Sequence, residues 1–429
     1  MAPERTYLCI DLKSFYASVE CVERGLDPMT ARLAVADPER GDKTICLAIS
    51  PAMKALGIRN RCRVFEIPRG LEYVKAVPRM RKYIEYAARI YGIYLDWIAK
   101  EDIHVYSVDE AFLDVTNYLK LYRTDGRGMA QRLMGAVLRQ TGIRATCGIG
   151  TNLYLAKVAL DITAKHAPDF IGELDEDRYR RELWRHRPLT DFWRIGGGIA
   201  TRLAGMGLYT MEDVARCDES WLYKAFGIDA ELLIDHAWGR EPVRMEHIKA
   251  YRSKTSCLSS GQVLMRDYAF DEGRLVAKEM MDQLCLDMVE KGVATASVTL
   301  AVGYARRRTE EGAPEEPGGT AGTAALPRAS SAAADWMDAV GKLYGEVVDP
   351  MRRIRRVNLT CNRLVREEDI EFGLFDLPTH EVKSRELQRT VNGIKRRFGK
   401  NAILKGMDLQ AGATARERNR QIGGHKSGD

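Results

Sequence analysis

Residues 7–20 read Tyr7-Leu-Cys-Ile-Asp11-Leu-Lys-Ser-Phe-Tyr16-Ala-Ser-Val-Glu20. The apolar run before Asp11 predicts a short buried strand with a carboxylate at its carboxyl end, and a helix is expected from Phe15 onward. A second segment, Tyr106-Ser-Val-Asp109-Glu110-Ala-Phe-Leu-Asp114-Val, also sets acids within a strand-like apolar pattern. Because neighbouring strands of one sheet can bring distant residues together, the two segments predict a cluster of carboxylates at one sheet edge.

Ninety-eight residues separate Asp11 from Asp109. Three carboxylates that converge would repel one another unless cations lay between them, and Mg²⁺ is the hard divalent ion that suits oxygen ligands and substrate phosphates. Two such ions, roughly 3.5–4 Å apart, can activate an attacking hydroxyl and stabilise a leaving oxygen. An isolated Asp-Glu pair is more often a surface turn, but apolar strand residues on both sides favour a functional site here.

The rest of the chain predicts several regions that alternate in character. A long amphipathic helix over 80–98 is followed by a strand–helix–strand pattern up to residue 149, typical of an α+β sheet domain. Residues 180–245 are helical and glycine-punctuated, and a second α+β pattern begins near Lys254. We expect a mobile loop at about 307–320, and we expect the residues after about Lys405 to be unfolded in isolation.

Composition restricts the class of protein. The chain has 429 residues and a net charge of 66 − 60 = +6, but residues 395–426 alone carry nine Lys and Arg against two acids. A basic tail on a balanced body favours a polyanionic partner, although such runs are often only solvated surface. Nine cysteines are scattered singly, and neither a membrane span nor a secretory signal is visible. The default expectation is a cytoplasmic protein with reduced thiols.

Both acidic segments resemble the metal-binding motifs of the Y-family, or DinB/UmuC-like, translesion DNA polymerases, and the resemblance runs in family order from Tyr7 to about Arg366. The segment from Ala413 to His425 resembles the ending of a bacterial UmuC-like subgroup. The family implies an α+β multidomain, right-hand fold with a ferredoxin-like palm, small fingers, a helix-hairpin-helix thumb and a little finger. The implied ranges are palm 1–24 and 75–170, fingers 25–74, thumb 171–245, little finger 252–366, and a clamp-binding-like segment with a basic tail at 367–429.

The resemblance also implies roles for individual residues. Asp11, Asp109 and Glu110 would be the catalytic acids that bind two Mg²⁺ ions, with the backbone carbonyl of Leu12 as a further ligand. Tyr16 would be the steric gate that excludes a ribose 2′-hydroxyl. The implied nucleotide-binding residues are Phe15, Tyr16, Lys54 and Lys165.

Three nucleotide- or DNA-binding motifs depart from the family pattern. Pro51 and Lys54 stand where the family has a tyrosine and an arginine on the triphosphate, and one extra residue precedes Lys165. Arg194 stands where a glycine is usual in the thumb hairpin. The DNA-binding residues implied by the resemblance are Gly196, Gly198, Arg352, Arg353, Arg355 and Arg356.

Glu371-Phe-Gly-Leu374-Phe375-Asp resembles the peptide that docks bacterial polymerases on the sliding clamp, with Glu371 in place of the usual glutamine. The function implied is a monomeric template-directed polymerase of low fidelity, without proofreading, that acts on primer-template DNA and deoxynucleoside triphosphates in DNA damage tolerance. Two alternatives remain open. One is a non-catalytic DNA- and clamp-bound adaptor, and the other is a two-metal nuclease, against which Tyr16 argues.

Overall fold

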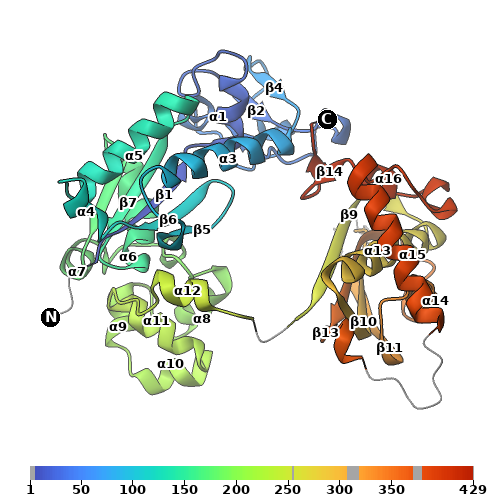
Figure 1. Cartoon of the computed structure of the whole chain (residues 1–429). Coiled ribbons are helices and arrows are strands. Elements are labelled where there is room, and N and C mark those ends of the chain that lie inside the picture. Colours follow the sequence, from blue (N-terminus) through green and yellow to red (C-terminus); the bar gives the residue numbers. More distant parts are fainter. Residues whose placement is uncertain (1–4, 254–255, 307–317, 371–378, 429) are drawn as a thin grey trace, which may run out of the picture. The chain divides into compact units, whose positions relative to one another are not determined.

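The apolar run near the amino terminus forms the central strand of a five-stranded sheet (Figure 1). In the computed structural model, which describes residues 5–253, 256–306, 318–370 and 379–428, the chain divides near residue 251 into two units. The sheet of the first unit has the order β5-β6-β1-β7-β8, in which only β7 and β8 pair in parallel. Its strands are β1 (Tyr7–Leu12), β5 (Ile103–Val105), β6 (Glu110–Asp114), β7 (Ala145–Gly150) and β8 (Ile171–Leu174).

Helix α6 (Leu153–Val158) packs directly on this sheet because β7 carries glycines at the contact. A Cβ atom at Gly148 would lie 2.0 Å from the carbonyl oxygen of Ala156, and one at Gly150 would lie 2.2 Å from its nitrogen. Tyr7 and Cys9 of β1 join this buried contact. The strand glycines therefore set how closely α6 approaches β1, and Asp11 is on the same side of β1 as Cys9.

The remaining elements of the first unit extend this sheet domain at both ends. A small three-stranded sheet, with order β3-β2-β4, has its own apolar core. A helical region with a separate core follows β8. Because β8 belongs to the large sheet, that sheet extends to residues 171–174, beyond the predicted palm boundary at residue 170. The elements are α1 (Phe15–Val22), β2 (Leu33–Val35), β3 (Ala48–Ile49), α2 (Pro51–Ala55), β4 (Val74–Ala76), α3 (Met80–Leu95), α4 (Tyr118–Leu121), α5 (Gly126–Thr141), α7 (Glu176–Leu183), α8 (Gly197–Gly205), α9 (Met211–Arg216), α10 (Glu219–Phe226), α11 (Asp229–Ala237) and α12 (Met245–Ala250).

The second unit is built on a five-stranded antiparallel sheet, in which the order is β11-β10-β12-β9 and β13 pairs with β10, and its apolar side chains pack against two helices. Its elements are β9 (Leu258–Tyr268), α13 (Phe270–Lys291), β10 (Val293–Tyr304), β11 (Gly319–Ser330), α14 (Ala333–Val347), β12 (Ile354–Asn362) and β13 (Val365–Arg366). Strand β11 lies at one edge of this sheet. Residues 307–317 of the predicted loop lie outside the described residues, whereas Gly319 and Thr320 are already in β11.

The residues after about Lys405, which were expected to be unfolded in isolation, are ordered in contact with the rest of the second unit. A helix, α15 (Thr379–Phe398), leads to α16 (Ala415–Arg418) and to a short hairpin of β14 (Gln421–Ile422) and β15 (His425–Lys426). These elements pack on α13 through polar contacts that the local sequence does not reveal. No helix among the described residues is long and apolar enough to cross a membrane.

Candidate active site

The two acidic segments are neighbours in the large sheet of the first unit. Strands β1 and β6 pair antiparallel with Asp11 directly opposite Glu110, and the N–H of Leu12 donates a hydrogen bond of 2.9 Å to the carbonyl oxygen of Asp109. Residues that are far apart in sequence therefore meet at one end of this strand pair. The pairing that the sequence pattern required is present.

Burial and two neighbouring acids destabilise the negative charge of Asp11 at this strand end. Burial raises the pKa of Asp11 to about 7, and the negative charges of Asp109 and Glu110 add to the shift. A divalent cation bound by oxygen ligands would relieve this repulsion, so the donor set fits Mg²⁺ chemically. However, within the described ranges no group of three or more His, Cys, Asp or Glu side chains is arranged to hold a metal ion. The backbones of the three acids are adjacent, but their side chains as described are not arranged around one metal position.

Lys157 of α6 forms an ion pair with the Glu110 carboxylate. Its Nζ lies 2.9 Å and 3.0 Å from the two oxygens of Glu110 and 2.9 Å from Oδ2 of Asp161, and the Cys9 thiol donates to Glu110 at 3.1 Å. Burial by itself would lower the pKa of Lys157, but the surrounding Cys9, Glu110 and Asp161 raise it. Lys157 was not among the site residues predicted from the sequence. The i, i+4 spacing of Lys157 and Asp161 was the available signal.

Lys165 contacts the same cluster from about two turns further along the chain. Its Nζ lies 3.1 Å from Oδ1 of Asp161, so Asp161 sits between two lysines. Between them, α6 passes into a π-helical turn at Ala159–Thr163. A π turn accommodates one more residue than an α turn, and such turns are frequent at functional sites. This turn gives a physical reason why the extra residue before Lys165 is tolerated.

Lys54 faces these groups from the small sheet region. Burial lowers the pKa of the Lys54 ammonium, while Asp11 and Lys165 are near enough for their charges to act on it. Pro51 is the first residue of α2, after the cap residue Ser50. Proline is favoured there because its fixed φ suits a helix start and its missing N–H would have no helical partner. Pro51 therefore starts the helix that carries Lys54.

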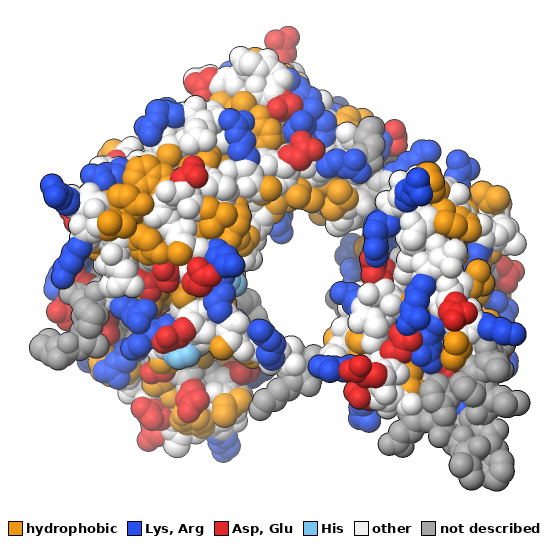
Figure 2. All heavy atoms as spheres, viewed as in Figure 1, with side chains coloured by type: hydrophobic (Ala, Val, Ile, Leu, Met, Phe, Trp, Pro, Cys, Tyr) orange, Lys and Arg blue, Asp and Glu red, His pale blue; other side chains and the backbone are white. Residues whose placement is uncertain are grey.

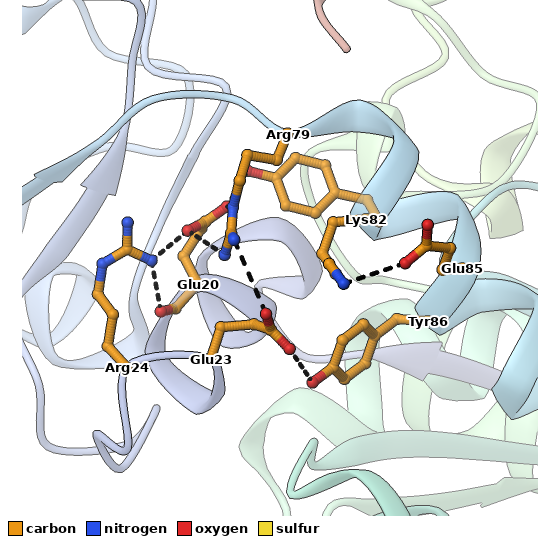
Figure 3. Close-up of polar contacts among 8 residues, drawn as sticks. Glu20, Glu23, Arg24, Arg79, Lys82, Glu85 and Tyr86 are labelled. Atoms are coloured by element: carbon orange, nitrogen blue, oxygen red, sulfur yellow. Dashed lines mark hydrogen bonds and ion pairs between the residues drawn. The ribbon is translucent and has the colours of Figure 1, made fainter. Parts of the chain in front are cut away.

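The Tyr16 ring rests on a buried polar network between α1 and α3. It stacks on Tyr83 with ring centroids 4.5 Å apart and an interplanar angle of 20°. The Tyr83 hydroxyl donates to Glu20 at 2.8 Å, and Arg79 donates two hydrogen bonds to the same carboxylate, at 3.0 and 2.9 Å (Figure 3). Glu20 is fully buried and also pairs with Arg24. Glu20 and Tyr83 were not predicted as part of this arrangement.

The glycine-rich turn before α8 has an open helix start. Gly196 caps α8 in an extended conformation, and a Cβ atom at Gly196 or Gly198 would meet nothing within 4 Å. Arg194 has a φ of +73°, in the left-handed region that favours glycine. Its guanidinium lies 4.9 Å from the centre of the Trp193 ring, which partly offsets the strained backbone. The preference for glycine at this position thus has a conformational reason.

In the second unit, the sheet face away from α13 and α14 carries small and polar side chains. Thr299 of β10 hydrogen-bonds Thr323 of β11 at 3.0 Å and accepts from Asn362 of β12 at 3.0 Å. The predicted basic residues stand at the start of β12. Arg353, Arg355 and Arg356 are exposed, whereas Arg352 packs its guanidinium over Tyr304 at 4.2 Å. Leu374 and Phe375 lie outside the described residues.

Comparisons with known proteins agree on one family. The impB/mucB/samB family matches residues 10–161, and the C-terminal domain of that family matches residues 257–374. A UV-damage repair protein of Bacillus subtilis, UvrX, is 29% identical over 99% of this chain and 98% of its own length. DNA polymerase IV 2 of the same organism is also 29% identical, over 99% of this chain and all of its own. A solved Y-family DNA polymerase chimera of Dbh and Dpo4 has the same fold, with a TM-score of 0.60 and 19% identity, over 84% of this chain and 99% of that one.

Proposed function

This chain belongs to the impB/mucB/samB family of Y-family (UmuC/DinB-like) polymerases, and we propose that it is a template-directed DNA polymerase of the translesion type. The observation that carries the proposal is the register that sets Asp11 opposite Glu110, with Asp109 bonded to the Leu12 backbone. The relatives named as DNA polymerase IV match nearly the whole chain, and this coverage supports the same activity for this chain.

In the proposed reaction the primer 3′-hydroxyl attacks the α-phosphate of a deoxynucleoside triphosphate in line, and pyrophosphate leaves. Asp11, Asp109 and Glu110, with the Leu12 carbonyl, would hold two Mg²⁺ ions, which when bound supply charge stabilisation and an activated hydroxyl. The raised pKa of Asp11, caused by burial and by its acidic neighbours, supports a cation-binding role. Lys157 forms an ion pair with the Glu110 carboxylate and would balance part of the negative charge of the site.

Lys54 and Lys165 would neutralise the leaving phosphates as point charges. A lysine lacks the planar fork with which an arginine grips a phosphate, so two lysines give attraction with little directional preference. Tyr16, with Phe15 beside it, would lie under the sugar of the incoming nucleotide. The Tyr16 ring cannot easily move away from the sugar, because Tyr83 stacks against it. Exclusion of a ribose hydroxyl follows from that rigidity.

Primer-template DNA would be held through phosphates rather than through base edges. The α8 start at Gly196 and Gly198 offers free backbone N–H groups, and the exposed Arg353, Arg355 and Arg356 offer positive charge. The small fingers region would enclose the nascent pair only loosely, which accounts for low fidelity and tolerance of damaged templates. We further propose that Leu374 and Phe375 dock on the sliding clamp and that the chain acts as a monomer.

The test is primer extension with Mg²⁺ on an intact and a lesion-bearing template. Asp109→Ala should abolish extension while DNA binding persists, because the acid acts on chemistry rather than on affinity. Glu101→Ala, which removes an exposed acid eight residues away, is the matched control and should extend normally. No extension by the unmodified chain would favour the adaptor, and shortening of the primer would favour the nuclease.

A further inference from the structure

The C-terminal segment of residues 399–427 is held on the second unit by buried acids of α13. Glu279 is only 4% exposed, and it accepts hydrogen bonds from the backbone N–H groups of Thr414 at 2.8 Å and Ala415 at 3.3 Å. Lys405 pairs with Asp282, one turn further along α13. A buried carboxylate without a partner is costly, so these contacts fix the segment in one position.

The segment also contacts edge strand β9 of the second-unit sheet. Arg418 donates to the Ser260 hydroxyl at 3.0 Å, and the Thr414 hydroxyl lies 3.2 Å from the side-chain oxygen of Gln262. Ser260 and Gln262 are partly buried, and the alternating residues Ser259 and Gly261 are exposed. By the period of two in a strand, the segment meets β9 on its helix side. It therefore lies along the border of the open sheet face.

Three exposed cations come together on this segment. The side chain of Asn401 donates to the carbonyl of Arg416 at 3.1 Å, and that of Asn419 donates to the carbonyl of Lys400 at 3.3 Å. Lys400 is thus joined to the turn that carries Arg416 and Arg420. All three side chains are exposed, and the charge of Lys400 also acts on the carboxyl group of Asp287 in α13. On the face shown in Figure 2, Lys and Arg side chains gather where Figure 1 places α16 and β14.

We propose that Lys400, Arg416 and Arg420 form a basic strip that binds the sugar–phosphate backbone of duplex DNA at the β9 border of the sheet. Both family-model matches end before residue 375, so this surface lies outside them. The inference rests on the proposed function only in taking DNA as the partner. The basic strip would add phosphate contacts beside the sheet face away from α13 and α14, which is itself mostly uncharged. It would make no contacts to base edges and so would confer no sequence specificity.

The test compares full-length chains in their affinity for a duplex with a recessed 3′ end, measured by fluorescence anisotropy between 50 and 200 mM NaCl. The variant Arg416→Ala/Arg420→Ala should lower the slope of log Kd against log salt by about 0.9 for each phosphate that it no longer neutralises. At 0.1 M salt each such phosphate corresponds to about eightfold weaker binding, since 0.1 raised to −0.9 is about 8. The thermal midpoint should stay unchanged, because both side chains are exposed.

The matched control is Lys342→Ala/Arg366→Ala, which removes the same charge from two exposed residues of the same unit. It should leave the slope unchanged. An unaltered slope and affinity in the Arg416/Arg420 variant, or an equal loss in the control, would overturn the proposal. Loss of primer extension in Asp109→Ala with an intact salt slope tests the catalytic proposal separately, so the two can fail independently.

Discussion

Replacing Arg79 with methionine should destabilise the first unit through the carboxylate of Glu20. That carboxylate is fully buried and receives hydrogen bonds from Arg79, Arg24 and the Tyr83 hydroxyl (Figure 3). Methionine keeps most of the apolar stem of Arg79 and removes both of its hydrogen bonds. Glu20 would then remain buried with only two of its three partners.

Removal of one partner from a buried ion pair costs about 3–5 kcal/mol, because an uncompensated charge is left behind. Arg24 still neutralises part of that charge and the Tyr83 hydroxyl still donates a hydrogen bond, so the expected loss in the free energy of unfolding is near the lower value, about 3 kcal/mol. A urea dependence of about 3 kcal/mol per molar, suited to a unit of this size, converts the loss to a midpoint shift of about 1 M.

The assay is urea unfolding of the full chain followed by tryptophan fluorescence. Five of the six tryptophans lie in residues 1–251, so the signal reports mainly on the first unit. Lys82→Met is the control, because Lys82 forms a solvent-accessible ion pair with Glu85 at 3.1 Å and such pairs contribute about 0–1 kcal/mol. A loss in Arg79→Met no larger than in this control would refute the argument.

The pH dependence gives an independent check. Burial alone would raise the pKa of Glu20, but hydrogen bonds from Arg79, Arg24 and Tyr83 lower it below the ordinary glutamate value. A carboxyl whose pKa is lower in the folded state stabilises the fold above its unfolded pKa, and the stabilisation is lost as the pH falls through the folded value. The stability difference between the unmodified chain and Arg79→Met should therefore shrink below about pH 4.5. A difference that grows on acidification would contradict this assignment.

Two further changes test the neighbourhood of the proposed site. Tyr16→Ala should raise ribonucleotide incorporation markedly, and Tyr83→Ala should give a smaller rise by freeing the Tyr16 ring; unchanged sugar discrimination in both would show that this ring is misassigned. Arg194→Gly should relieve about 1–2 kcal/mol of left-handed backbone strain and lose about 0.5–1 kcal/mol of stacking on Trp193, so a thermal midpoint no higher than that of the unmodified chain would contradict it.

The parts of the site that sequence predicted are those coded by local patterns. The apolar run ending at Asp11 and the interrupted strand at Asp109 each specify a strand with an acid at a known place, and pairing of the strands brings the acids together. The place of Lys157 depends on how α6 is rotated against the sheet. That rotation is set by contacts of Gly148 and Gly150 with the helix backbone, which no local periodicity encodes.

The C-terminal segment was missed for a related reason. Taken alone it is polar, basic and short of apolar residues, which is typical of an unfolded tail. Its order comes from Glu279 and Asp282, more than 120 residues earlier in the chain. A composition argument counts what a segment can bury by itself, and it cannot count acceptors that another helix supplies.

One physical property, shared by Glu20, Glu110 and Glu279, explains which features the sequence predicted and which it did not. Each is an acid at a position where the surrounding pattern is apolar, and each is paired with a group from a distant segment: Arg79, Lys157 and the Thr414 backbone. Because a buried carboxylate without partners would cost several kcal/mol, any packing that left one unpaired is strongly disfavoured. Such an acid therefore selects the relative position of two elements more sharply than apolar contacts, which tolerate sliding. An acid within an apolar pattern thus predicts that a partner exists, and only the fold identifies which residue it is.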